Sequence, residues 1–229
     1  MSGLFSGFKK NTEPEAPVTA QATPPVATKD EFGEMKERLH LGAARMKPHF
    51  MGNILSALHH LCDEDTERAQ ETILALFGYL RQSVEGLNRK ELLPYSWELG
   101  HAQNYLALEE LRFEGRLIAE VETDVESFEI PPITLQPLVE NAIKHGLAPL
   151  ERPCHVTVLT RRMADGSVQI QVTDDGAGFD TAILSSPEYE EKSLACIRRR
   201  LQREVNGTME IVSSPGNGTC VTVTLPPQN

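Results

Sequence analysis

Hydrophobic residues in the first half of the chain recur every three or four positions, which is the period of an amphipathic helix. Two such runs follow each other, and the polar stretch Cys62-Asp63-Glu64-Asp65 separates them. The first stripe contains Leu39, Ala43, Met46, Phe50, Ile54, Ala57 and Leu61, and the second contains Ala69, Ile73, Leu76, Leu80 and Val84. The pattern predicts a helix capped by Asp30, a second helix that ends at Gly86, and an antiparallel hairpin of the two.

A helical hairpin buries its apolar stripe poorly on its own, whereas two hairpins in a four-helix bundle bury both stripes. We therefore expect residues 30–88 to form a dimerisation hairpin and the chain to be a homodimer. Residues 1–29 precede this hairpin, and from position 11 onward they are rich in Pro, Ala, Thr and Glu without periodicity. That composition predicts a disordered N-terminal segment and linker, because it holds too few large apolar residues to fold alone.

The second half of the chain, residues 89–229, mixes helical periods with strand-like alternation. We expect Ser96 to cap a third helix and Gly146 to lie just past the C-terminus of a fourth. The other expected elements are strands at 117–121, 156–161, 168–172, 208–212 and 220–225 and helices at 133–144 and 193–205. Residues 181–192 are polar with no firm period. This order predicts an α+β domain, with helices packed on one face of a mostly antiparallel sheet.

Composition and charge narrow the classes of function. The net charge of −11 disfavours binding to nucleic acid. The four cysteines lie far apart without a C-x-x-C spacing, which disfavours a zinc site and fits a reducing cytosol. No apolar run approaches the roughly 20 residues that a membrane span needs, so we expect a cytoplasmic chain. Leu4, Phe5 and Phe8 precede two lysines. This N-terminal segment is expected either to be a frayed terminus or to make a weak contact with a membrane or a receptor.

The first helical run contains an unusual stretch, Lys47-Pro48-His49-Phe50-Met51-Gly52-Asn53. A proline inside a helix removes a hydrogen bond and kinks the helix at a cost of roughly 3 kcal/mol, and Gly52 adds to that cost. His49 and Asn53 are one turn apart and share a face beside the apolar stripe. They form either an exposed imidazole nucleophile with an amide one turn away or a surface histidine on a kinked helix.

A glycine-hinged loop, Thr173-Asp174-Asp175-Gly176-Ala177-Gly178-Phe179-Asp180, follows the alternating strand that ends at Val172. Glycines two apart let a backbone approach a ligand closely, and a carboxylate at a strand end can accept a hydrogen bond from the amino group of a base. Asp and Gly are also ordinary turn residues, so this stretch alone describes either a ligand site or a surface turn.

The expected helix at 133–144 gathers Asn141, Lys144 and His145 on one side by its i+3 and i+4 spacings. An amide oxygen, an ammonium group and an imidazole together can hold Mg²⁺ and polyphosphate oxygens. The same residue types are common on the solvated face of a helix, and that alternative stays open here.

The order of these motifs resembles that of the LytS-type sensor histidine kinases. The motifs are P-H-F-x-x-N, Y-L-x-L-E-x-x-R-F, L-V-E-N-A-I-K-H-G, D-x-G-x-G and G-x-G-T, and the resemblance covers about residues 38–226. It implies a helical hairpin that forms a dimeric four-helix bundle, followed by a layered α/β sandwich of the gyrase, Hsp90, kinase and MutL (GHKL) ATPase type. It also implies ATP and Mg²⁺ as cofactors.

The resemblance implies roles for particular residues. His49 matches the phosphoacceptor, and Asn53 matches a polar residue that positions water for dephosphorylation. Glu140 matches a carboxylate that orients metal-bound water. The residues that match nucleotide contacts are Asn141 (the Mg²⁺ ligand), Lys144, His145, Asp174 (the adenine contact), Gly176, Gly178, Arg200, Gly216, Gly218 and Thr219.

Some positions depart from the family pattern around the predicted ATP lid. Ser193 replaces a glycine and Cys196 replaces an asparagine, while Glu190-Glu191 stand where small residues are expected beside the phosphates. Carboxylates beside a triphosphate are electrostatically unfavourable unless a cation lies between them. Phe50 follows the histidine where many kinases place a carboxylate, so the sequence does not identify the general base.

The favoured function is a two-component signal-transduction kinase that autophosphorylates His49 with Mg-ATP. It would then pass the phosphoryl group to an aspartate of a response regulator in a phosphorelay. An imidazole with a pKa near 6.5 is partly neutral at about pH 7, as attack requires. Two alternatives stay open, a catalytically weak nucleotide-binding adaptor and a phosphatase of a phosphorylated response regulator that uses Asn53.

Overall fold

A computed structural model describes residues 48–89, 91–185 and 193–228 of the chain. The elements, in order, are α2 (Pro48–Glu64), α3 (Thr66–Asn88), β1 (Leu93–Pro94), α4 (Tyr95–Arg112), β2 (Leu117–Thr123), β3 (Glu129–Ile130), α5 (Leu135–Asn141), a π-helical turn (Ala142–Leu147), β4 (Cys154–Arg162), β5 (Val168–Asp174), a 3₁₀ turn (Thr181–Ser185), α6 (Ser193–Val205), β6 (Thr208–Ser213) and β7 (Thr219–Leu225). The predicted linker, the cap at Asp30, Leu39, Ala43, Met46 and Glu190-Glu191 lie outside the described residues.

Helices α2 and α3 form the predicted hairpin. The Asp65 side chain caps α3 by accepting a hydrogen bond from the Arg68 backbone N–H at 3.0 Å. Helix α3 continues two residues beyond the expected end at Gly86. Of the two predicted stripes, Phe50, Ile54 and Leu76 are buried, whereas Ile73 is 47% exposed. Pro48 is the first described residue of α2, so the predicted kink there stays a prediction.

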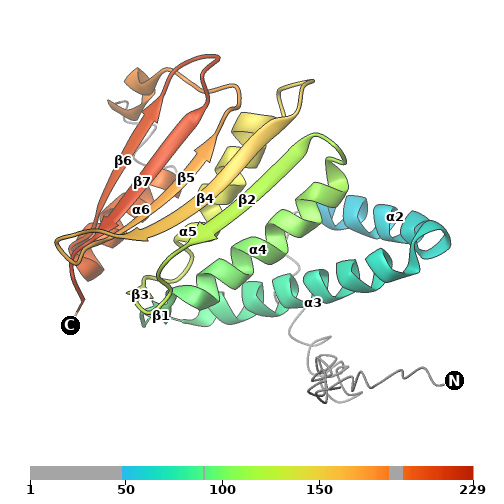
Figure 1. The fold of residues 1–229 in the computed structure, drawn as a ribbon, viewed down its shortest axis with the longest axis horizontal. Helices are drawn as coiled ribbons and strands as arrows, with labels where there is room; N and C mark the ends of the chain where they lie inside the picture. The colour runs from blue at the N-terminus through green and yellow to red at the C-terminus, as the bar shows by residue number, and fades with distance from the viewer. Residues whose placement is uncertain (1–47, 90, 186–192, 229) are drawn as a thin grey trace, which may run out of the picture.

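Helix α4 lies between the hairpin and the β2 edge of the sheet (Figure 1). Its seam with α3 is held by polar contacts: Gln82 Nε2 donates to the Trp97 carbonyl at 3.2 Å, and Ser83 Oγ lies 3.1 Å from His101 Nε2. Burial lowers the pKa of His101 to about 4, so the imidazole in this seam is neutral near neutral pH. The hairpin is therefore attached to the following domain through a hydrogen-bonded helix pair.

The sheet has the strand order β2-β4-β5-β7-β6, and only the β2–β4 pair is parallel. Buried and less buried residues alternate along β4, β5 and β7, so one face of the sheet contributes to the core. Helices α5 and α6 lie behind that sheet in Figure 1. The predicted α+β class, with helices on one face of a mostly antiparallel sheet, is confirmed.

Several predicted boundaries were wrong. Ser96 does not cap α4, which begins at Tyr95 without a side-chain cap. Gly146 does not follow a helix end but lies inside the π-helical turn. Strand β5 continues through Asp174 because its ladder with β7 extends to the Asp174–Thr219 pair. The two-residue strands β1 and β3, which pair with each other, gave no periodic signal.

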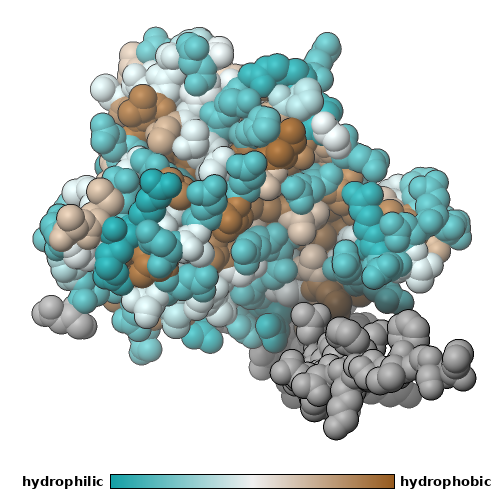
Figure 2. Space-filling view, in the orientation of Figure 1, coloured by the Kyte–Doolittle hydropathy of each residue, from teal (hydrophilic) through white to brown (hydrophobic). Residues whose placement is uncertain are grey.

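The face of the molecule in Figure 2 is mostly hydrophilic, and brown hydrophobic side chains appear on it as separate patches. This is the surface expected from an acidic composition with 24% charged residues. Within the part of the chain that the structure describes, no helix is long and apolar enough to cross a membrane.

Candidate nucleotide site

A cavity of about 380 Å³ lies where β5 and β7 meet the C-terminal end of α5. Its size falls within the range of small-molecule sites, roughly 300–1,000 Å³. The lining residues are Leu138, Asn141, Ala142, His145, Pro149, Val172, Asp174, Ala177, Gly178, Phe179, Ile183, Leu184, Leu194, Thr219 and Val221. The cavity thus combines apolar walls with polar groups from motifs that are distant in the sequence.

Asp174 is the buried carboxylate of this cavity, with 5% of its surface exposed. One oxygen, Oδ1, accepts a hydrogen bond from the Gly176 backbone N–H at 2.9 Å. Burial raises the pKa of Asp174 to about 6, against the lowering effect of the backbone N–H groups of Gly176 and Thr219. The sequence left this stretch open between a surface turn and a ligand site, and the observed burial supports the ligand site.

Glycines make this corner of the cavity possible by close approach. A Cβ on Gly176 would lie 2.3 Å from the Gly146 Cα, and a Cβ on Gly146 would lie 2.5 Å from Asp174 Oδ1. A Cβ on Gly218, whose φ is +71°, would lie 2.0 Å from the Asp174 carbonyl oxygen. Larger residues cannot occupy these positions without displacing the carboxylate or its strand. Sequence reasoning missed this role of Gly146, which it treated as a helix terminator.

The helix α5 and the π-helical turn that follows it determine which predicted phosphate contacts reach the cavity. Asn141 and His145 line it, whereas Lys144 is exposed and is not among the lining residues. The expected grouping of all three on one helix side assumed an α-helical period, which the π turn widens. Lys144 therefore stays a prediction as a nucleotide contact, without support from the cavity.

The last glycine motif forms the loop between β6 and β7. Gly218 is buried and Thr219 lines the cavity, while Gly216 is exposed, and a Cβ added to it would meet no atom within 4 Å. Gly216 instead donates its N–H to the Ala177 carbonyl at 2.7 Å. This bond ties the loop to the D-x-G-x-G segment, with Gly178 at φ +58° facing the Ser214 carbonyl. The two glycine motifs thus shape one wall together.

Sequence reasoning missed most of the apolar wall. Phe179, Ile183, Leu184 and Leu194 all line the cavity. Residues 181–192 were interpreted as polar without a period, but Thr181–Ser185 forms a 3₁₀ turn that brings Ile183 and Leu184 to the cavity. Because this turn is too short to show a hydrophobic period, the only available signal was the Ile-Leu pair itself.

The predicted phosphoacceptor lies on the hairpin. His49 is exposed, and its Nδ1 lies 3.3 Å from Asn53 Nδ2. The predicted pairing of these two side chains along one helix face is therefore observed. The neighbouring Phe50 is buried, and its ring lies 5.5 Å from that of Tyr79 and 5.7 Å from that of Tyr105, measured between centroids. His49 is thus exposed to solvent, while the residue after it, Phe50, is packed in an aromatic cluster.

Glu140, on α5, interacts electrostatically with this aromatic cluster. It precedes Asn141, accepts a hydrogen bond from Gln136 Nε2 at 2.8 Å, and is half-buried. Burial raises the pKa of Tyr79 to about 12, with the Glu140 charge as a further cause. A carboxylate on α5 is therefore close enough to interact electrostatically with the hairpin.

Arg200, predicted to contact nucleotide, does not line the cavity. Its Nη2 donates to the Ile133 carbonyl at 2.5 Å and to Thr134 Oγ1 at 3.3 Å. The part of the predicted lid that the structure describes begins at Ser193, where α6 starts, and Leu194 reaches the cavity wall. Cys196 is exposed on the same helix.

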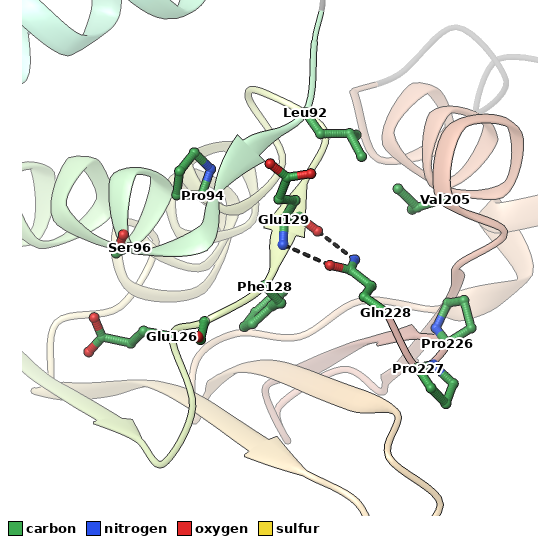
Figure 3. A pocket seen from close by; sticks show the side chains of 11 residues that line it. Leu92, Pro94, Ser96, Glu126, Phe128, Glu129, Val205, Pro226, Pro227 and Gln228 are labelled. Carbon is green, nitrogen blue, oxygen red and sulfur yellow. Dashed lines mark hydrogen bonds between the residues drawn. The ribbon is translucent and has the colours of Figure 1, made fainter.

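A second and larger concavity, of about 730 Å³, lies at the opposite end of β7, beside the C-terminal residues (Figure 3). There the Gln228 side-chain amide bonds to both backbone groups of Glu129, at 2.8 and 2.7 Å. Its lining includes Glu126 and Glu129, and the adjoining concavity adds Glu91 and Glu204. Carboxylates at this density disfavour a polyphosphate, so size alone would select the wrong site.

The cavity at Asp174 fits ATP on chemical grounds. A buried carboxylate between apolar walls can accept the amino hydrogen of adenine while the walls contact the rings. The Asn141 amide oxygen would be the protein ligand of Mg²⁺, which usually keeps waters and phosphate oxygens as its other ligands. Among the described residues, His, Cys, Asp and Glu do not gather in threes that could hold a metal by themselves.

Family models match two successive parts of the chain. The model described as "Histidine kinase" matches residues 37–117, and the model described as "Histidine kinase-, DNA gyrase B-, and HSP90-like ATPase" matches residues 133–229. The first range covers the hairpin and α4, and the second covers α5, α6 and the strands β4 to β7 with the whole candidate site.

Similar curated proteins include Sensor protein LytS of Bacillus subtilis (strain 168), which is 38% identical over 151 residues, 65% of this chain and 25% of that protein. Sensor histidine kinase YesM of the same organism is 31% identical over 191 residues, 81% of this chain and 33% of that protein. Putative uncharacterized protein YwpD, also from that strain, is 29% identical over 80% of this chain and 67% of its own length. The chain thus spans between a quarter and two thirds of these relatives.

Proposed function

The chain belongs to the LytS-type sensor histidine kinases, and on that premise we propose that it transfers the γ-phosphoryl group of ATP to His49. The phosphoryl group would then pass to an aspartate of a separate response regulator. The observation that best supports this proposal is the cavity, which brings Asn141, His145, Asp174 and Thr219 together from three motifs. The exposed imidazole of His49 supplies the matching acceptor.

Each group in the cavity has a distinct part in the proposed reaction. Asp174 accepts the adenine amino hydrogen and the apolar wall excludes water from the base. Asn141 would hold Mg²⁺, which when bound would neutralise charge on the phosphates. His145 adds a donor at the same end of the cavity. Transfer of a phosphoryl group needs positioning and charge neutralisation more than covalent help from the protein.

His49 attacks through one ring nitrogen. The Asn53 amide Nδ2 lies 3.3 Å from Nδ1 and donates to it, so in this arrangement Nδ1 accepts and Nε2 carries the proton. Attack through Nε2 therefore requires the other tautomer, with the proton on Nδ1. A bond from Nε2 to the γ-phosphorus forms while the bond from that phosphorus to the bridging oxygen of ADP breaks. We expect Glu140, which lies on the hairpin side of α5, to accept the proton that the imidazolium releases.

The hairpin is proposed as the homodimer interface. Leu55, Ile73 and Leu74 are 54%, 47% and 51% exposed, so apolar surface remains after α4 covers one side. A second hairpin would bury it in a four-helix bundle. The acceptor helix and the regulator-docking surface would then belong to the same bundle.

Incubation of the purified chain with Mg²⁺ and γ-labelled ATP tests the kinase function. Wild type should acquire acid-labile label, and His49→Gln should lose it while binding Mg-ADP as wild type does. His59→Gln, an exposed histidine on the same helix, is the matched control and should keep the label. A wild-type chain that binds ADP but never acquires label would contradict the kinase function and support the adaptor alternative.

A phosphatase activity is the second candidate, and the contact between His49 and Asn53 favours it. An amide held beside the acceptor can orient a water molecule toward a phosphoaspartate docked there. Loss of phosphate from a cognate phospho-regulator should be slower with Asn53→Ala than with wild type. Ser56→Ala, an exposed change on the same helix, should have no effect. Equal rates for Asn53→Ala and wild type would remove this candidate.

A further inference from the structure

Glu98, on α4, is a fully buried carboxylate outside the nucleotide cavity, with 0% of its surface exposed. Its Oε1 accepts the Ile133 N–H at 2.6 Å. Its Oε2 accepts the N–H groups of Thr134 and Leu135 at 3.0 and 2.9 Å. One side chain from another helix therefore accepts the N–H of Leu135, the first residue of α5, and those of the two residues before it, which the helix cannot bond itself.

Arg200, on α6, holds the same segment from the other side. Its guanidinium donates to the Ile133 carbonyl and to Thr134 Oγ1, which in turn donates to the Pro131 carbonyl at 2.6 Å. The opposite charges of Glu98 and Arg200 interact across this segment. Ile133 thus has its N–H bonded to α4 and its C=O bonded to α6.

The backbone of Ile133 shows how firmly this segment is held. Its φ is +58°, a left-handed conformation that is unfavourable for a β-branched residue. Strain of this kind costs of order 1–3 kcal/mol and persists only where the surroundings over-determine the conformation. The two side chains that bond Ile133 provide that constraint.

The three helices that meet at this joint lead to different parts of the proposed reaction. Helix α4 contacts α3 of the hairpin through the Gln82 and Ser83 hydrogen bonds. Helix α5 ends at Asn141 in the cavity, and α6 contributes Leu194 to the cavity wall. A movement of α5 or α6 on nucleotide binding must therefore either break the joint or move α4 with it.

We propose that Glu98 and Arg200 are positioning residues that couple the nucleotide cavity to the hairpin. They do so by joining α4, α5 and α6 at Ile133 and Thr134. The proposal rests on the proposed kinase function, because the hairpin presents the acceptor histidine. Neither residue lines the cavity. Their role is to keep α4, and with it the acceptor hairpin, at a set position relative to Asn141.

The test uses the full chain with Glu98→Gln, Arg200→Gln and the double variant. Glu109→Gln is the matched control, since Glu109 is a buried carboxylate on the same helix whose side chain accepts hydrogen bonds from Tyr105 and Arg112 of that helix, away from the joint at Ile133. The labelling rate of His49 at saturating ATP should fall about tenfold or more in each single variant, with a smaller change in Kd for Mg-ADP. The double variant should be no slower than the slower single variant, because the two act through one joint.

A second readout does not depend on kinase activity. In wild type, Mg-ADP should change the hydrogen exchange of amides in the α3 segment that contacts α4, and Glu98→Gln should abolish that change. Arg200→Lys keeps the positive charge and one hydrogen-bond donor, so its labelling rate and its exchange change should lie between those of wild type and Arg200→Gln. This variant also tests the coupling if Glu98→Gln does not fold. An unlabelled wild type would contradict the proposed kinase function, while the exchange data would still decide the coupling.

The coupling is overturned if the Glu98 and Arg200 variants lose thermal stability, as we expect of Glu109→Gln, but keep the saturating rate and the ADP-dependent exchange of wild type. Additive losses in the double variant would also contradict it, because they would mean that the two residues act separately.

Discussion

The two ends of the proposed reaction lie in opposite surroundings. At the adenine end, Asp174 is buried, and three neighbouring glycines leave no room for a Cβ beside it. At the acceptor end, His49 is exposed, and a Cβ on nearby Gly52 would meet nothing within 4 Å. Close contacts thus hold the pocket side chain in place, whereas the acceptor is left accessible.

This difference follows from what each end must do. A base-binding pocket gains affinity when its polar group is already oriented, because no ordering is needed on binding. An acceptor that meets two partners in turn, first a nucleotide and then a regulator, has to remain open on one side. We therefore expect substitutions at the pocket to be severe and those around the acceptor helix to be mild, unless they remove the reactive group itself.

The largest effect is expected from Gly218→Ala. The new Cβ would lie 2.0 Å from the Asp174 carbonyl oxygen, so its cost should exceed the about 1–3 kcal/mol of ordinary overpacking. Gly216→Ala is the matched control, with a φ of +81° but open space, and should cost only about 1 kcal/mol. Thermal unfolding and Mg-ADP titration measure both. Equal effects would mean that the crowding at Asp174 is relieved by a small movement.

Asp174→Asn should weaken Mg-ADP binding by about 10–100-fold while the chain stays folded. The amide oxygen can still accept the Gly176 N–H, so the local backbone keeps its bond. Asp175→Asn, an exposed neighbour, is the control and should bind nearly as wild type. Calorimetric titration gives both affinities. Unchanged affinity in Asp174→Asn would place the adenine contact elsewhere.

The pH dependence of the pocket follows from the raised pKa of Asp174, about 6. Protonation removes the acceptor, so Mg-ADP affinity should fall as the pH drops below about 6, and Asp174→Asn should lack this dependence. The free energy of unfolding depends on pH in the opposite direction. The folded state binds the Asp174 proton more tightly than the unfolded state does. The stabilisation from Asp174 is therefore fully present below the ordinary pKa of an aspartate and is lost as the pH rises through about 6. Denaturant unfolding of wild type and Asp174→Asn across this range measures the difference in slope.

The smallest effect is expected from Gly52→Ala on the acceptor helix. Alanine is preferred to glycine in a helix by about 0.5–1 kcal/mol, and the position has open space, so the chain should become slightly more stable. Labelling of His49 should stay at the wild-type rate. A marked loss of labelling would mean that the acceptor end is as constrained as the pocket.

The sequence predicted the fold class because the periods of its long elements are unambiguous. Helix α6 was expected at its observed bounds, and the strands β4 to β7 were expected within two residues of theirs. Errors fell where local signals conflict with tertiary contacts. Gly146 looked like a helix terminator, and the wide π turn around it is compatible with its close approach to Asp174. The ranges 1–47 and 186–192 offer no such comparison, because they lie outside the described residues.

By itself the sequence determined the types and order of the long elements, since their periods record these directly. It also supplied Asn141, His145 and Asp174 by residue type and position, while Thr219 came from the resemblance of its motif to the family. Only the tertiary structure decided which neighbours of those residues share the cavity. It excluded Lys144 and Arg200 from the lining, added Ile183 and Leu184, and made Glu98 the carboxylate that holds α5. The physical reason is that a short segment's period reports burial along that segment, whereas each of these outcomes depends on contacts between segments far apart in the chain.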